Sequence, residues 1–104
     1  MKTIKHNGKT MHIGASEERA MRIVAHSGVA KRSEFEEGRG RYKRYILPTR
    51  RRMKELGMVE VYKDHTEYHG SRARKFFAGE GKRCYSAIFA NTARINSILK
   101  KLEG

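Results

Sequence analysis

The small number of large apolar side chains is the property that most limits what this chain can fold into. Leucine, isoleucine, valine and phenylalanine together make up 19 of the 104 residues, just under the ~20% that indicates disorder when net charge is also high. A single proline, five tyrosines and several segments with clean periodicity argue against disorder. We therefore expect one folded domain over residues 1–104 with a thin core, which a partner or a second copy helps to stabilise.

The second constraint is a large excess of positive charge. Lysine and arginine number 24 against 11 acidic residues, which gives a formal net charge of +13. Such a chain repels itself unless a polyanion or an acidic surface is near, so nucleic acid is the default partner. Eight basic residues and no acid lie between Arg39 and Lys54. This is more charge than solubility requires, although a solvated helix face is the ordinary alternative.

Other classes of protein are disfavoured by what the chain lacks. A single cysteine, Cys84, leaves no internal disulfide or Cys-pair zinc site and fits a reducing, cytoplasmic compartment. No run approaches the ~20 apolar residues of a membrane span, and the first residues do not resemble a signal peptide. Asp64 is the only aspartate, so the clustered carboxylates of a two-metal nuclease are not expected. His65 and His69 have metal-ligand spacing but fall in an expected loop. We expect no enzyme, metal or cofactor.

The first third of the chain predicts a hairpin followed by a helix. Asn7-Gly8 separates two short alternating runs and favours the positive φ angles of a type I′ turn. Ser16 is expected to cap a helix that has Glu17 in its first turn and ends at Gly28, with apolar residues at helical spacing between them.

The middle of the chain predicts two shorter helices. The Ser33-x-x-Glu36 pattern is a capping box, which places a short second helix after Ser33. Pro48 bars a continuous helix through the basic block but fits the first turn of a new one. We therefore expect a third helix over 48–56, with Met53 and Leu56 facing the core and Gly57 as its stop.

The last third predicts a hairpin and a final helix. The alternating run 58–62 and the run 74–78 are interpreted as two strands that flank a basic loop. A helix over 85–102 follows, in which Ile88, Ile95 and Leu102 repeat every seven residues. This helix either packs on the core of its own domain or forms a homodimer with a second copy, and we slightly favour the dimer.

The order of these elements resembles a known family. Helix, short helix, basic helix ending in Leu56-Gly57 and then a two-stranded hairpin is the layout of winged helix-turn-helix proteins. The stretch 47–61 resembles the recognition helix and first wing strand of small DNA-binding proteins of phage or mobile-element type. The resemblance covers 16–79 and departs from the pattern at 38–40. It implies an α+β, mainly α, winged-helix fold with an N-terminal β-hairpin and an added C-terminal helix over 83–104.

The resemblance also implies a set of contact residues. A recognition helix presents its N-terminal residues to base edges, and a wing grips phosphate or the minor groove. From the residues themselves, an arginine fork can bond guanine, and three successive arginines span most of a helical turn, so at least one must face the bases. The amides that begin the second helix could bind phosphate. The expected nucleic-acid-binding residues are Lys31, Arg32, Arg41, Lys43, Arg44, Thr49, Arg50, Arg51, Arg52, Lys54, Arg72 and Arg74.

Two tyrosines in the basic block have two interpretations. Tyr42 and Tyr45 lie three residues apart, a spacing that could stack unpaired bases. The more ordinary interpretation is that both form the edge of the core together with Ile46. For Arg72 and Arg74, the ordinary interpretation is a polar hairpin tip.

These patterns favour a double-stranded DNA-binding protein that acts as a transcriptional regulator of phage or mobile-element type. One alternative is binding of structured or ribosomal RNA, which the same charge and the tyrosine pair would serve. Another is a phage-encoded inhibitor whose basic face docks on a host protein or nuclease.

Overall fold

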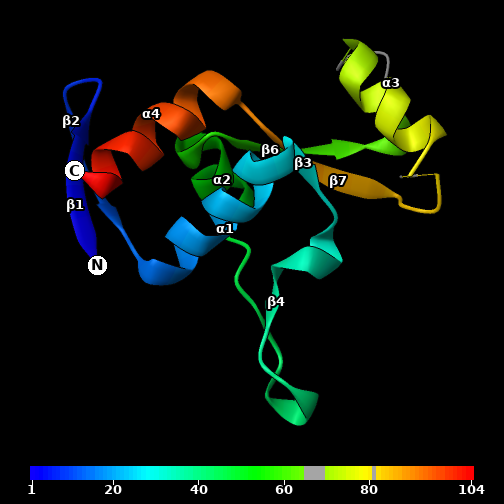
Figure 1. Cartoon of the computed structure of the whole chain (residues 1–104), viewed down its shortest axis with the longest axis horizontal. Coiled ribbons are helices and arrows are strands. Elements are labelled where there is room, and N and C mark those ends of the chain that lie inside the picture. Colours follow the sequence, from blue (N-terminus) through cyan, green and yellow to red (C-terminus); the bar gives the residue numbers. More distant parts are fainter. Residues whose placement is uncertain (65–69, 81) are drawn as a thin grey trace.

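A computed structural model describes residues 1–64, 70–80 and 82–104. Within them, four α-helices and three small antiparallel sheets form an α+β domain (Figure 1). None of the helices described is long and apolar enough to cross a membrane.

The N-terminal hairpin is confirmed. β1 (Lys2–His6) pairs antiparallel with β2 (Lys9–Ile13). Asn7 and Gly8 connect them with φ angles of 52° and 78°, the left-handed geometry that a type I′ turn needs at both central residues. Asparagine and glycine adopt this geometry at low cost, so the turn follows directly from the dipeptide.

The first helix is confirmed, but its cap is not Ser16. α1 (Ala15–Ser27) begins after Gly14, whose backbone N–H donates to Glu17 Oε1 at 3.0 Å. The glutamate three residues into the helix therefore satisfies the backbone that precedes it, and Ser16 lies inside the first turn. Gly28, at φ 83°, ends the helix as expected.

The prediction of a short second helix after Ser33 is wrong. A single 3₁₀ turn, η1 (Arg32–Phe35), forms there, and its capping carboxylate is Glu34, which accepts from the Lys31 N–H at 2.6 Å. Phe35 is fully buried in the core. The next residue, Glu36, is already extended, with φ −92° and ψ 136°.

A hairpin takes the place of the rest of that helix. β4 (Glu36–Glu37) pairs antiparallel with β5 (Arg44–Tyr45) around the 3₁₀ turn η2 (Gly40–Tyr42). We call residues 36–45 the basic hairpin. Figure 1 shows that it projects from the body of the domain, well away from the other two sheets.

The basic helix is confirmed with a later start. α2 (Arg50–Leu56) is capped by the Thr49 hydroxyl and ends at Gly57, which has a φ of 90°. Met53 and Leu56 are buried, as their positions predict.

The prediction of a second wing strand over 74–78 is wrong. β6 (Met58–Tyr62) is a strand as expected, but 74–78 belongs to α3 (Gly70–Ala78). The partner of β6 is instead β7 (Ser86–Ala90), and β3 (Val29–Ala30) completes a sheet of order β3-β7-β6.

A second small core accounts for α3. Ala73 and Phe77 lie one helical turn apart and are buried against Val61 and Phe89, which point from one face of the sheet. The helical spacing of these contacts outweighs the strand preference of adjacent phenylalanines, because strand propensity depends on what the sheet offers to pack against.

The predicted start of the final helix is also wrong. Its expected first turns are β7, and α4 (Thr92–Glu103) begins after Asn91, whose side chain accepts from the Arg94 N–H at 3.3 Å. Ala87 and Phe89 face α3 whereas Ile88 faces the larger core. Because both faces of β7 are covered, it forms a continuous apolar run that periodicity alone cannot distinguish from a buried helix.

α4 packs within its own domain, between α1 and the N-terminal hairpin (Figure 1). A Cβ on Gly57 would lie 2.9 Å from the backbone nitrogen of Ile95, so the glycine permits the close approach of α4 to α2. The apolar face of the helix is buried in the larger core through Ile95, Ile98, Leu99 and Leu102. Of the two roles expected for this helix, these four side chains serve the one within the domain.

Candidate nucleic-acid interface

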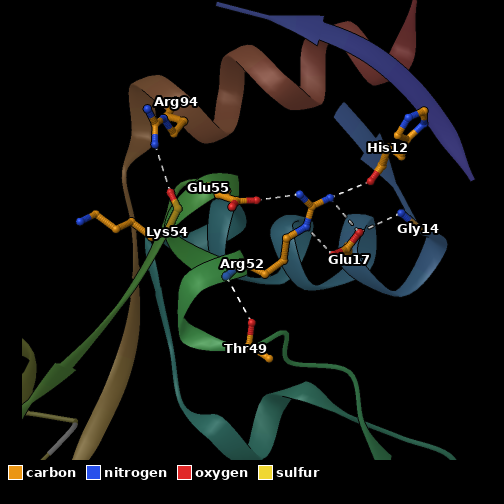
Figure 2. Close-up of polar contacts among 8 residues, drawn as sticks. All are labelled: His12, Gly14, Glu17, Thr49, Arg52, Lys54, Glu55 and Arg94. Atoms are coloured by element: carbon orange, nitrogen blue, oxygen red, sulfur yellow. Dashed lines mark hydrogen bonds and ion pairs between the residues drawn. The ribbon is translucent and has the colours of Figure 1, made fainter. Parts of the chain in front are cut away.

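The three successive arginines of α2 have three different environments. Arg50 and Arg51 are exposed, and Lys54 lies beside them on the same side of the helix. Arg52 points the other way, toward α1 and β2 (Figure 2). A period of 3.6 residues per turn produces this division, because the core occupies the third side of the helix.

Arg52 is engaged entirely within the protein. Its Nε donates to Glu17 Oε2 at 2.7 Å and its Nη2 to Glu17 Oε1 at 3.2 Å, a two-pronged ion pair with α1 (Figure 2). The same guanidinium donates to the His12 carbonyl at 2.7 Å and to Glu55 at 2.9 Å. Glu17 raises the pKa of Arg52, and Arg52 lowers the pKa of Glu17. Arg52 therefore holds α2 in position.

α4 provides a second support for α2. Arg94 Nη1 donates to the Lys54 carbonyl at 3.1 Å, close to the C-terminus of α2 (Figure 2). The last carbonyls of a helix lack partners within the helix, and a cation is favourable there. Arg52 thus holds α2 from one side and Arg94 holds its C-terminal end, while the Arg51 and Lys54 side chains stay exposed.

Arg50 leans over the sheet. Its Nε lies 3.3 Å from Glu60 Oε1, and its guanidinium stacks 5.1 Å from the centre of the Tyr62 ring. Arg32 reaches the same carboxylate from η1, with Nη1 2.5 Å from Oε2. Glu60 also accepts from the Tyr62 hydroxyl at 2.9 Å and from Ser86 at 3.3 Å, and its side chain is only 4% exposed.

The basic hairpin is tied to the body at its base. Glu37 pairs with Arg19 of α1 through both carboxylate oxygens and with Arg44 at 3.5 Å. These arginines lower the pKa of Glu37, with Arg19 as the larger cause. Toward the tip, Arg41 and Lys43 are exposed.

Tyr42 and Tyr45 do not form the edge of the core. Tyr42 is 81% exposed and Tyr45 61% exposed, whereas the neighbouring Ile46 is buried. Both rings lie outside the buried core, so the core-edge interpretation is wrong.

The structure places both expected wing contacts, Arg72 and Arg74, on α3. Arg72 lies on α3, where its Nη2 donates to the Gly28 carbonyl at 2.7 Å and its guanidinium lies 5.5 Å from the centre of the Phe89 ring. Arg74 lies on the same helix, and both residues are exposed. His65 and His69 lie outside the described residues. Among those that are described, no group of three or more potential metal-ligating side chains comes together.

Several residues of this region were not expected from the sequence. Arg39 is exposed at the tip of the basic hairpin, and its place in the basic block was a usable signal. Glu60 and Tyr62 fall on one face of β6 by strand alternation. Nothing local indicates that Arg32, 28 residues earlier, meets Glu60, or that Arg94 meets α2.

Comparisons with known proteins add no relative. The chain matches no protein-family model, and no curated protein or solved structure is detectably similar to it.

Proposed function

We propose that this protein binds double-stranded DNA through the exposed side of α2 and the basic hairpin, and that it acts as a small transcriptional regulator. One observation carries the proposal. Of the eight basic residues in 39–54, three are paired with carboxylates: Arg44, Arg50 and Arg52. The other five are exposed and make no ion pair with the carboxylates that the structure describes: Arg39, Arg41, Lys43, Arg51 and Lys54.

The concentration of unpaired cations gives this surface its meaning. Cations without a described carboxylate partner also lie elsewhere, as at Arg74 and Lys75 of α3, but in 39–54 five of them fall within 16 positions that contain no acidic residue. A concentrated group of cations without carboxylate partners can bind the phosphates of DNA instead, and this binding releases counterions from the DNA. A helix held by Arg52 and Arg94 also presents Arg51 and Lys54 in a defined orientation, which base recognition requires.

The order of elements is also compatible with the resemblance to winged-helix proteins. α1, then α2 closing at Leu56-Gly57, then β6 paired antiparallel with β7, keep much of that layout. The basic hairpin stands where the layout has a second helix, and α3 lies between β6 and β7. For this chain we therefore assign the second contact element to the basic hairpin and not to Arg72 of the expected wing.

Salt dependence of duplex binding tests the proposal. If the five unpaired cations each neutralise one phosphate, log K should fall with log salt at a slope of about −4.5. Arg51→Ala should reduce the size of this slope by about 0.9. The matched control is Arg22→Ala, because Arg22 shares its charge with Glu18 and Glu103. Undetectable binding of random duplexes at ~50 mM salt would refute the proposal.

Sequence preference is a separate question. Selection of bound duplexes from a random pool would yield a preferred site if α2 reads bases. Arg51→Ala should then weaken the preferred site more than random DNA, because a base contact carries discrimination that a phosphate contact lacks.

The exposure of two tyrosines favours RNA as a second candidate. Tyr42 and Tyr45 are exposed on the basic hairpin, and unpaired RNA bases stack on aromatic rings beside basic groups. Competition between a structured RNA and a duplex DNA of matched length separates the two candidates. RNA that displaces DNA at equal concentration would favour the second.

A further inference from the structure

An open cleft lies at the base of the basic hairpin, next to the start of α2. Its volume is about 530 Å³, within the range of about 300–1,000 Å³ that is typical of ligand pockets. Residues from η1, β5, α2 and β6 and from the segment before α2 line it: Arg32, Tyr45, Pro48, Arg50, Glu60 and Tyr62. Because Tyr45 belongs to the hairpin and Arg50 to α2, the cleft is shared by the two elements to which the proposed DNA contacts belong.

The charges in the cleft favour one anionic group. The Glu60 side chain is buried beneath Arg32 and Arg50, and its oxygens already form ion pairs with both guanidiniums and accept from two hydroxyl groups. The arginine side chains are 53% and 71% exposed, so they face the solvent with donors that Glu60 does not use. Two guanidiniums against one carboxylate leave a net positive charge, and the buried carboxylate fixes their positions.

The walls of the cleft favour a flat ring. Tyr45 is 61% exposed and forms one wall. Tyr62 forms part of another and is held in place by Arg50 over its face and by Tyr85, whose ring centre lies 5.8 Å away. An aromatic surface beside fixed guanidiniums can take a base and its phosphate together.

We propose that the cleft receives a single unstacked nucleotide of the bound DNA. The base lies against Tyr45, and the phosphate contacts Arg32 and Arg50. This inference rests on the proposed DNA binding and narrows its substrate to duplexes in which one nucleotide has left the stack. An already unpaired nucleotide enters most easily, because no pairing or stacking energy is lost.

The test compares three duplexes of the same sequence: one fully paired, one with a single bulged 2-aminopurine, and one with an abasic bulge. Wild-type protein should bind the 2-aminopurine bulge about 5-fold or more tightly than either of the others, since stacking on one aromatic ring is worth at least that much. The fluorescence of the bulged base should also change on binding, because it reports stacking. This readout needs no variant.

Two variants on the same hairpin locate the effect. Tyr45→Ala should reduce the ratio of bulged to paired affinity to about one, whereas Tyr42→Ala, outside the cleft, should leave that ratio unchanged even if it weakens both affinities. Circular dichroism checks that each variant is folded.

Every outcome decides the question. Equal affinity for the paired and bulged duplexes, or for the base and abasic bulges, overturns the cleft proposal and leaves duplex binding intact. Binding of the bulged duplex alone supports the cleft and overturns the broader duplex proposal. Failure to bind any of the three overturns both. A structured RNA loop that displaces the bulged DNA overturns the assignment to DNA.

Discussion

Arg52 in α2 and Glu17 in α1 form a two-pronged ion pair, with Nε–Oε2 at 2.7 Å and Nη2–Oε1 at 3.2 Å, across 35 positions of sequence. The Glu17 carboxylate also accepts from the N–H of Gly14, at the end of the N-terminal hairpin (Figure 2). Two side chains therefore connect the hairpin, the first helix and the basic helix. Together with the buried Met53 and Leu56, this connection fixes the position of α2.

Loss of Arg52 should reduce stability. Arg52→Ala is expected to lower the free energy of unfolding by about 1–2 kcal/mol, because it removes several hydrogen bonds to a charged partner at a partly exposed site. Urea denaturation monitored by circular dichroism measures this change. The control is Arg51→Ala on the same helix, which should alter the free energy by less than about 0.5 kcal/mol. Equal effects of the two substitutions would contradict a structural role for Arg52.

The same ion pair predicts a pH dependence. The hydrogen bonds from Arg52 are the largest cause that lowers the pKa of Glu17 below its ordinary value of 4.5. A carboxyl group whose pKa is lowered by folding stabilises the protein above its unfolded pKa, and this contribution is lost as pH falls through the folded pKa. The destabilisation by Arg52→Ala should therefore be complete near pH 6 and should shrink below about pH 4.5.

Urea denaturation at both ends of this range, with wild type and Arg52→Ala, is the measurement. Glu17→Gln should show the same convergence toward wild type in acid, because protonation removes the charge that the substitution removes. A difference between wild type and variant that is constant with pH would exclude this linkage.

The basic hairpin depends on one glycine. Gly38 has a φ of 96°, and a Cβ there would collide with the carbonyl of Tyr42. Gly38→Ala should therefore distort the tip and, if the hairpin contacts DNA, weaken duplex binding with little effect on the free energy of unfolding. Gly40→Ala is the matched control, because its φ is also positive, at 60°, but no atom lies within 4 Å of the added group. Titration of labelled duplex should show a larger loss for Gly38→Ala, and equal losses would argue against the hairpin as a contact.

Arg72 and Arg74 should differ in what they affect. Arg72→Ala is expected to lower the free energy of unfolding by about 1 kcal/mol, because it removes one of two donors to the Gly28 carbonyl, which keeps the Ala90 N–H at 2.9 Å, and removes a stacked cation from Phe89. Arg74→Ala, at an exposed position, should change stability by less than about 0.5 kcal/mol. The salt slope of DNA binding should be the same for Arg72→Ala and wild type. A slope reduced by about 0.9 would restore Arg72 as a phosphate contact.

Elements defined by nearby residues could be predicted from the sequence. Asn7-Gly8 specifies its own turn geometry, and Gly28 and Gly57 end α1 and α2 with the left-handed conformation that glycine adopts readily. Elements defined by distant partners could not. β7 is a strand because β6 and β3 supply its hydrogen bonds while apolar groups cover both its faces, and α3 is a helix because Phe77 and Ala73 meet that sheet together.

The candidate site divides in the same way. The sequence by itself determined that positive charge is concentrated between Arg39 and Lys54 and that part of it lies on a short helix, because composition and capping are local properties. Only the tertiary structure decided that Arg52 faces inward to Glu17, that Arg50 is held by Glu60, and that Arg51 stays free of described carboxylates. The physical reason is that the role of a cation depends on the acidic group that reaches it, and here those groups come from distant parts of the chain.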